Sequence, residues 1–254
     1  MFPYRDENET LRTPIVTIAL IAANVLVWLV VQGAGSELKL ASSVCNLGLI
    51  AGELTGRLEP GTQFPMGRDL VCQTDPGWHP EHLVTSMFLH GSWMHLLGNM
   101  WFLWLFGNNI EDSMGRLRFI LFYLICGLAA AGLQIAITPG SPVPMVGASG
   151  AISGVMGAYL VLYPLVRVYV LLPLFVFITS VALPAWTMLI YWIVLQLLSG
   201  VTVLGRAREA GGEVAFWAHV GGFVAGLVLI KLFARRDYVA AHQARHWRPQ
   251  RQAW

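Results

Sequence analysis

Three groups of polar residues interrupt the long apolar stretches of this chain, and their residue types are those that acyl transfer needs. In the first group, Ser149 follows a proline-rich break and is flanked by Gly147 and Gly150, so it should begin a helix. Free backbone N–H groups at a helix N-terminus would stabilise a developing oxyanion. Serine becomes a nucleophile at neutral pH when a base lies beside it. We predict that His219, in another apolar stretch, is that base.

The third group supplies hydrogen-bond donors. His95 and Asn99 lie four positions apart, which places them on one face of a helix, and both side chains can donate to an oxygen. We expect them to stabilise an oxyanion formed at Ser149. The segment around His219 holds no acidic residue except Glu213, so the sequence predicts a Ser–His dyad rather than a triad.

Each group alone also fits a purely structural role: helix–helix hydrogen bonds for His95 and Asn99, and a satisfied core histidine for His219. The glycines by themselves indicate close packing, because small residues let helix backbones approach. They form one face that includes Gly150 and a second face with Gly222 and Gly226 four positions apart. Together, these faces would bring the serine and histidine backbones close to each other.

The elements that must position these residues are apolar. Hydrophobic residues make up 56% of the 254 residues and charged residues only 12%, about half the share of a soluble domain. This composition excludes a soluble enzyme, a disordered protein and a secreted disulfide scaffold. The net charge of +2 is too small to indicate a nucleic-acid partner. The lipid bilayer is therefore the expected surroundings.

Stretches without charged residues predict six membrane spans. A bilayer core needs about 20 apolar residues for each helix. The expected spans cover about 13–33, 92–110, 117–137, 148–166, 183–203 and 214–232. We expect 168–182 to be a loop or a partly embedded piece rather than a seventh span. The first apolar stretch is interpreted as a retained helix, not as a cleaved signal peptide.

Basic residues predict the orientation of these spans. With six spans, eleven Lys and Arg residues lie on the side of the two termini and five on the other side. Because basic residues favour the cytoplasmic side, both termini should be cytoplasmic. The expected layout is a cytoplasmic N-terminus at 1–12, a membrane domain at 13–233 and a basic cytoplasmic tail at 234–254. The long connection at 34–91 should be external.

The external loop contains two of the three cysteines, Cys45 and Cys72. Disulfides persist on external faces, so a Cys45–Cys72 bond is one possibility, and two unpaired thiols are the other. Spacing does not decide between them. Cys126 lies in the middle of the expected third span, where core packing is its expected role.

These motifs resemble those of the rhomboid family of intramembrane serine proteases. The resemblance covers most of residues 78–230 and consists of four motifs in order: His90, His95 and Asn99; Gly107, Glu111, Gly115 and Phe119; Gly-x-Ser-Gly around Ser149; and Ala218, His219 and the glycines up to Gly226. The resemblance implies a six-helix, all-α bundle that cleaves membrane-anchored proteins without a cofactor or metal. It also implies that the Ser149 backbone N–H joins the oxyanion hole and that His90 is structural.

The sequence departs from the family pattern at two positions. Many rhomboids carry a Trp-Arg pair in the first external loop, whereas His79 follows Trp78 here. Some members place a tyrosine four residues after the nucleophile, where this chain has Ser153. The orientation of His219 must then depend on other groups.

The leading hypothesis is an intramembrane serine endopeptidase in a bacterial cytoplasmic (inner) membrane. A rhomboid-like pseudoenzyme that binds transmembrane clients without cutting them is the alternative, and a small-solute channel or transporter is a third class. For substrate entry we predict a gate in the fifth span, which carries Trp192 and Gln196 and has Gly200 as its one glycine. The competing interpretation is that its aromatic residues face lipid or form the interfacial belt.

Overall fold

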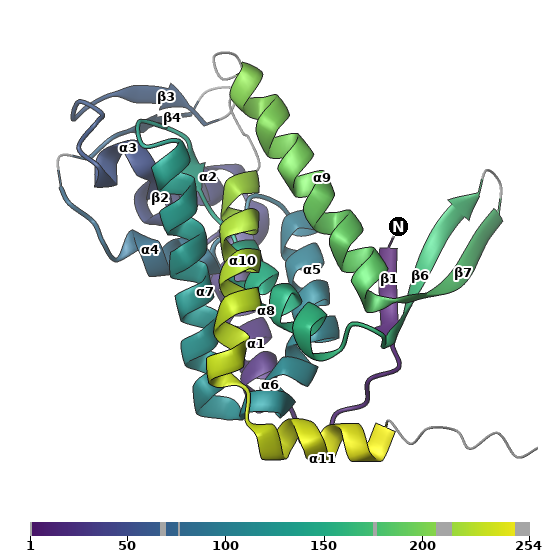
Figure 1. Cartoon of the computed structure of the whole chain (residues 1–254). Helices are drawn as coiled ribbons and strands as arrows, with labels where there is room; N and C mark the ends of the chain where they lie inside the picture. The colour runs from purple at the N-terminus through teal and green to yellow at the C-terminus, as the bar shows by residue number, and fades with distance from the viewer. Residues whose placement is uncertain (1, 67–69, 76, 175–176, 207–214, 247–254) are drawn as a thin grey trace, which may run out of the picture.

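The chain folds into a helical bundle with small sheets at its edges, as a computed structural model shows (Figure 1). The structure describes residues 2–66, 70–75, 77–174, 177–206 and 215–246. Residues 207–214, which include Glu213 and the start of the expected sixth span, lie outside the described residues, as do 247–254 of the expected tail. The α-helices are α1 (Ile15–Val30), α2 (Glu37–Leu47), α3 (Ala51–Leu54), α4 (His82–Thr85), α5 (Trp93–Phe102), α6 (Asn108–Met114), α7 (Arg116–Ile137), α8 (Ser149–Leu162), α9 (Ala185–Arg206), α10 (Phe216–Phe233) and α11 (Arg236–His246).

The chain is an integral membrane protein. Three helices among the described residues are long and apolar enough to cross a bilayer: α7, α9 over Ala185–Thr202, and α10, with mean hydropathies of 2.2, 1.5 and 1.7. Two shorter helices, α1 and α8, are also apolar. Helix α5 continues through a π-helical turn, η3 (Leu103–Gly107), into α6, so this part of the chain is helical over most of 93–114.

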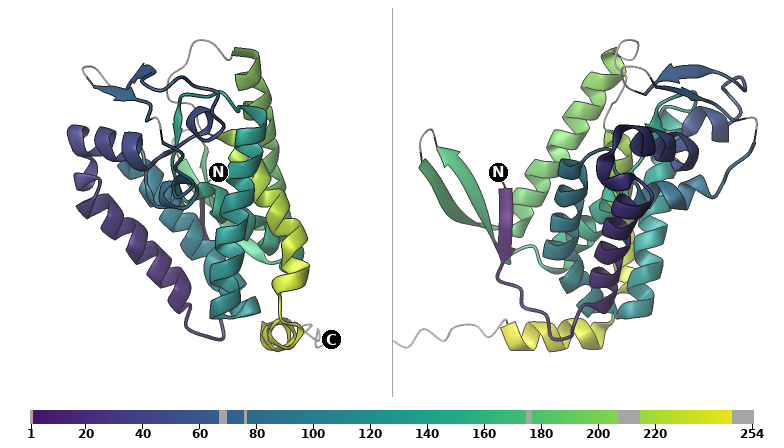
Figure 2. Two further views of the ribbon diagram at one scale, coloured as in Figure 1. Left: turned by 90° about the vertical axis from the view of Figure 1, so that its left-hand side faces the viewer. Right: turned by 180° about the vertical axis from the view of Figure 1, so that it is seen from behind.

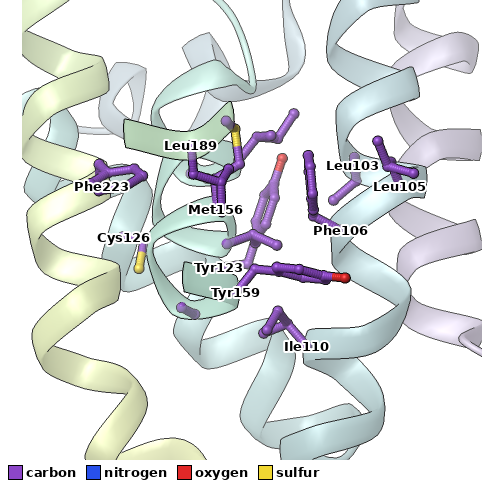
Figure 3. Close-up of a cluster of buried hydrophobic side chains, with 14 of the residues drawn as sticks. Leu103, Leu105, Phe106, Ile110, Tyr123, Cys126, Met156, Tyr159, Leu189 and Phe223 are labelled. Atoms are coloured by element: carbon purple, nitrogen blue, oxygen red, sulfur yellow. The ribbon is translucent and has the colours of Figure 1, made fainter. Parts of the chain in front are cut away.

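Helix α8 lies at the centre of the bundle. Every residue from Gly150 to Tyr159 is buried, and the helix packs against α7, α10 and η3. Large aromatic side chains fill the space around it, with Phe106 edge-on to Tyr159 at 4.9 Å and Tyr123 nearby (Figure 3). Tight packing on all sides therefore fixes the helix that begins at Ser149.

The expectation of an all-α fold is wrong in detail, because the bundle carries three small antiparallel sheets. They are β1–β6–β7, β2–β5 and β3–β4. Their strands are β1 (Phe2–Asp6), β2 (Leu49–Ile50), β3 (Gln63–Pro65), β4 (Val71–Gln73), β5 (Pro144–Met145), β6 (Arg167–Leu174) and β7 (Phe177–Pro184).

The segment 168–182, expected to be a loop or an embedded piece, belongs to the β6–β7 hairpin that projects from the bundle (Figure 1). Its β-branched and aromatic residues favour strands. Strand β1 supplies the partner of β6, with Phe2 opposite Leu171 and Asp6 opposite Val168. The strand character follows from this pairing with a distant segment, which the uncharged sequence of the hairpin alone does not indicate.

Residues 9–12 and helix α11 lie at one end of the bundle. Arg12 Nη1 lies 3.0 Å from Asp112 Oδ1, and the C-terminal helix α11 crosses below the bundle (Figure 2). His242 Nε2 lies 3.0 Å from the Glu9 carbonyl oxygen, and the Arg235 N–H donates to the Ser113 carbonyl oxygen. The N-terminal segment, α6 and α11 are therefore joined directly.

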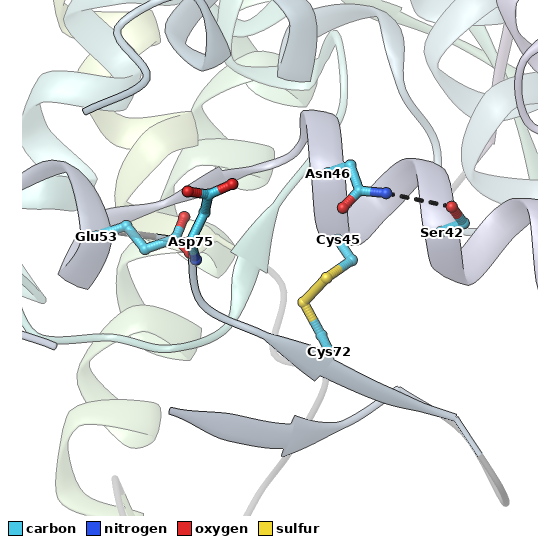
Figure 4. The surroundings of a disulfide bond; sticks show 6 residues. All are labelled: Ser42, Cys45, Asn46, Glu53, Cys72 and Asp75. Atoms are coloured by element: carbon cyan, nitrogen blue, oxygen red, sulfur yellow. Dashed lines mark hydrogen bonds between the residues drawn. A yellow bond between two sulfur atoms is a disulfide. The ribbon is translucent and has the colours of Figure 1, made fainter. Parts of the chain in front are cut away.

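The opposite end carries α2, α3 and the β3–β4 hairpin. A disulfide between Cys45 and Cys72 joins α2 to β4, with a Cα–Cα distance of 5.6 Å (Figure 4). Of the two possibilities that the sequence left open, the disulfide is the one present. Cys126 is a free, buried thiol, and it packs against α8 beside Gly154.

Candidate active site

Ser149 is the first residue of α8 and lines a cavity of about 1600 Å³. The turn before it depends on Gly147, which has a φ of +126° and donates its N–H to the Ser86 carbonyl oxygen at 2.8 Å. A Cβ atom at Gly147 would lie 2.8 Å from two atoms of the His95 ring. Glycine is therefore required here both by the backbone conformation and by the close approach of His95.

The structure brings Ser149 and His219 together. The His219 Nε2 atom lies 2.7 Å from Ser149 Oγ, which is a hydrogen-bonding distance. His219 is the fourth residue of α10, so both side chains lie near the N-terminal ends of their helices. A hydroxyl that donates to an imidazole nitrogen is the arrangement that activates serine as a nucleophile.

Glycine faces allow this contact. A Cβ atom at Gly222 would overlap the Gly150 carbonyl oxygen, and one at Gly226 would overlap the Gly154 carbonyl oxygen. The backbones of α8 and α10 thus touch along two turns. Both faces expected from the sequence lie in this contact, and no side chain larger than hydrogen fits at Gly222 or Gly226 without separating the helices.

The His95 ring projects into the same cavity from α5. Its Nδ1 atom accepts the Gly91 N–H at 3.3 Å, which leaves the proton of a neutral ring on Nε2. Ser92 caps the helix by accepting the His95 N–H at 3.1 Å. The Nε2 atom and Cε1 face Gly147, so a donor is directed toward the turn that precedes Ser149.

Asn99 lies one turn below His95 and also lines the cavity. Its side chain is buried, and its Nδ2 atom has no hydrogen-bond partner among the described residues. A buried amide donor without a partner carries a free-energy cost of about 1–3 kcal/mol. A group that accepts from Asn99 during a reaction would recover that energy.

His90 is fully buried and supports this region. Its backbone N–H donates to Gln32 Oε1 at 2.8 Å, and its carbonyl oxygen accepts from Gln32 Nε2 at 2.8 Å. Its ring packs edge-on against His95 at 5.1 Å. Gln32 was not singled out in the sequence, although a lone amide next to the end of an apolar stretch was a signal for such a contact.

Helix α9 contacts His219 through the two residues expected to form a gate. Gln196 Oε1 lies 2.8 Å from His219 Nδ1, and the Trp192 ring centroid lies 5.7 Å from that of His219. Trp192 therefore supplies the aromatic contact with His219, because Ser153 stands where some members of the family carry a tyrosine. Ser153 Oγ instead donates to the Ser149 carbonyl oxygen at 2.6 Å. The sequence signal was the four-residue spacing, which places the tryptophan and the glutamine on one face of the helix. Their role as a gate stays a prediction.

The Gly107–Glu111–Gly115–Phe119 motif lies at the far end of the bundle from the cavity. Glu111 accepts three hydrogen bonds: from the Val16 N–H at 3.0 Å, and from the Thr17 N–H and hydroxyl at 2.8 Å each. It therefore caps the N-terminus of α1. Gly115, with a φ of +83°, makes the turn between α6 and α7.

Comparison with known families identifies the family of this chain. A model of the Rhomboid domain matches residues 77–236, which is more than half of the chain. The fold and the residues of the cavity are those of a polytopic membrane protein with a serine and a histidine in contact. The chain belongs to the rhomboid family.

Its relatives include plant, animal and bacterial proteins. The chain is 38% identical over 79 residues to Rhomboid-like protein 11, chloroplastic, of Arabidopsis thaliana, covering 31% of this chain and 27% of the relative. It is 33% identical over 154 residues to the mitochondrial Presenilin-associated rhomboid-like protein of Bos taurus, covering 57% and 36%. It is 42% identical over 78 residues to Rhomboid protease GluP of Bacillus subtilis (strain 168), covering 31% and 15%. The matches thus span about a third or less of these relatives' length.

Proposed function

We propose that this chain is an intramembrane serine endopeptidase that hydrolyses peptide bonds in or near the transmembrane segments of membrane-anchored proteins. The contact between His219 Nε2 and Ser149 Oγ is the observation that carries the proposal. Binding of a client without cleavage, as in a pseudoenzyme, has no use for this pair. A relative named as a protease, GluP, adds support from the family.

The geometry supports the following steps. Ser149 Oγ attacks the substrate carbonyl carbon while its proton passes to His219 Nε2, and the protonated ring then donates to the leaving amine. A water molecule repeats the sequence on the acyl-enzyme. Three donors serve the oxyanion of each tetrahedral intermediate: the Ser149 backbone N–H, the Asn99 amide and His95 Nε2.

Gln196 takes the position beside the histidine that an acid holds in a triad. Its Oε1 atom accepts the His219 Nδ1 proton, which leaves the Nε2 lone pair directed at Ser149. The amide carries no charge, so it fixes the tautomer and the orientation of the ring without strongly stabilising the protonated form. In the proposed mechanism, Gln196 is a positioning residue.

The proposed topology has six spans with both termini cytoplasmic, an external loop at 34–91 and a basic tail at 234–254. Two contacts support this topology. Strand β1 precedes the first proposed span and pairs with β6, which follows the fourth. Helix α11 follows the sixth proposed span and contacts the N-terminal segment through His242. An even number of spans between these segments puts them on one side of the membrane. A bacterial cytoplasmic membrane is the proposed location.

The test compares the parent protein with Ser149→Ala and His219→Ala on a panel of single-span substrates in lipid vesicles. Each variant should lose about 10⁴-fold or more in turnover, because the nucleophile and base act as a unit. Ser153→Ala, one turn along the same helix, is the matched control and should keep most of its turnover. Unchanged thermal unfolding would show that the variants are folded. Cleavage at the parent rate by both dyad variants would contradict the proposal and favour another site.

A further inference from the structure

Two histidines and two acids gather in the segment that follows β4 and ends at the first residue of α4, away from the cavity that holds Ser149. The segment runs from Asp75 to His82, and none of its charged side chains lines that cavity. Donor atoms of His79, Glu81 and His82 all lie within 4.8 Å of one another. This is the one group of three or more potential metal ligands found within the described residues.

The individual contacts centre on the His79 ring. Its Nδ1 atom lies 2.9 Å from Glu81 Oε1, and its Nε2 atom lies 3.7 Å from Asp75 Oδ1. The His82 ring stacks on the His79 ring, with centroids 5.0 Å apart and planes 19° apart. Two imidazoles with two carboxylates beside them thus share one small volume.

The surrounding structure holds this group in place. The Asp75 N–H donates to Glu53 Oε1 at 2.8 Å, close to the disulfide (Figure 4). Asp75 Oδ1 accepts the Gly77 N–H at 2.9 Å. The His82 side chain is largely buried.

We propose that His79, Glu81 and His82 bind a zinc ion, with Asp75 close enough to supply a fourth ligand. Imidazole nitrogen and carboxylate oxygen are ligands of zinc, whereas calcium and magnesium are bound by oxygen alone. Zinc–ligand bonds of about 2.0–2.1 Å in a tetrahedron place donor atoms about 3.3 Å apart. The side chains of His79 and Glu81 are partly exposed, 32% and 58%, so rotation about their side-chain bonds can close the remaining gap.

Bound zinc would also affect the turn at Gly147 that precedes Ser149. His82 begins α4, which continues directly into Ser86, and the Ser86 carbonyl oxygen accepts the Gly147 N–H at 2.8 Å. Zinc would therefore tie the disulfide-linked segment to the residue that supports the turn before Ser149. The site adds stability to the external face without taking part in proton transfer.

Titration of the purified, tag-free full chain with zinc by calorimetry tests the proposal, with cobalt absorption as a second measurement. We expect one equivalent of zinc to bind and to raise the unfolding temperature by about 5 °C when zinc is at 100 times its dissociation constant. His79→Asn and Glu81→Gln should each weaken binding at least about tenfold. Both residues are partly exposed, so these variants should fold.

Two controls locate the ion. Glu59→Gln, an acid outside this segment and before β3, should bind zinc like the parent. His219→Asn should also bind one equivalent, which excludes the dyad histidine as the ligand. The proposal would be overturned if the parent failed to bind zinc. It would also be overturned if His79→Asn and Glu81→Gln bound zinc with the same affinity as the parent.

Discussion

Helix α10 makes two kinds of contact on its two sides. Against α8 it packs backbone to backbone, with Gly222 against the Gly150 carbonyl. Against α9 it packs through side chains, with Trp192 6.2 Å from Phe223 and Gln196 bonded to His219. The outer face of α9 is exposed and apolar, at Trp186, Tyr191, Val194, Leu198 and Val201.

The difference separates two tasks. A backbone contact has one geometry, so the α8–α10 pair fixes the distance between nucleophile and base. Side-chain contacts can repack, so α9 is the element that we predict to move and still return to the histidine. This division would let α9 open one side of the cavity while Ser149 Oγ and His219 Nε2 keep their distance.

Breaking the backbone contact should have the largest effect. In Gly222→Val the new side chain must push α10 away from Gly150, and a shift of about 1 Å at a catalytic group can cost about 100-fold in rate. We expect turnover and unfolding temperature both to fall. Gly132→Val is the matched control, because a Cβ atom there meets nothing within 4 Å. Full activity in Gly222→Val would show that the contact is not needed.

Removing the amide on α9 should have the next largest effect. Gln196→Met keeps the volume but leaves the His219 Nδ1 proton unpaired, at a cost of about 1–3 kcal/mol, or about 5- to 150-fold in kcat. Gln196→Glu should instead move the acid limb of the pH–rate profile to higher pH, because a carboxylate stabilises the protonated ring. Leu195→Ala, on the exposed side, is the control. An unchanged profile in Gln196→Glu would contradict a positioning role.

A substitution at Trp192 of α9 distinguishes a role in supporting His219 from a role in gating substrate entry. Trp192→Ala removes a ring that lies against His219 and loosens α9. We expect cleavage of an embedded substrate to rise relative to cleavage of a short soluble peptide, since the peptide can enter from water. Trp186→Ala, at the start of the same helix, is the comparison. An equal fall for both substrates would leave Trp192 as a support and contradict the gate.

Sequence reasoning singled out Ser149 and His219, which the structure places in contact, because the signals in each segment were local. These signals were a serine at a helix start, a histidine beside glycines and two donors on one helix face, and the glycine faces were needed to bring the segments together. The contact between Gln196 and His219 depends on how α9 is rotated about its axis, which its apolar composition does not fix. The same limit applies to Gln32 and His90, which lie 58 positions apart and meet only in the folded chain.

The fold was predictable where charge and hydropathy decide it. The α7 helix was expected at 117–137 and lies at Arg116–Ile137. The β6–β7 hairpin was missed because an uncharged apolar stretch fits a loop, an embedded piece or a strand equally well. Strand β6 pairs both with β7 and with residues 2–6, and no periodicity within 168–182 reveals the second partner, which is far away in the sequence.

The smallest expected effect concerns Asp6, which contacts α8 near its C-terminal end. Asp6 Oδ2 accepts the Tyr159 hydroxyl at 2.7 Å, which ties α8 to the N-terminal strand. Burial raises the pKa of Asp6 from 3.8 to about 6. The folded chain then holds a proton that the unfolded chain has lost, so this group's contribution to stability is present below about pH 4 and is lost as the pH rises through 6.

We therefore expect Asp6→Asn to flatten the pH dependence of the unfolding temperature between pH 4 and 7, with little change in turnover. Glu9→Gln, an exposed acid of the same segment, should leave the dependence unchanged. A parallel pH profile for Asp6→Asn and the parent would show that the aspartate does not contribute.

The cap on α1 has a consequence for biosynthesis. The carboxylate of Glu111 that satisfies the first N–H groups of α1 is encoded 94 and 95 positions after Thr17 and Val16. A ribosome that adds about 5–20 residues per second makes Glu111 roughly 5–20 s after these residues. During that interval the start of α1 must find water or lipid headgroups, because hydrocarbon offers no acceptor. The N-terminal cap of α1 is thus completed only after Glu111 has been made, so the start of α1 reaches its final set of hydrogen bonds later than the rest of that helix.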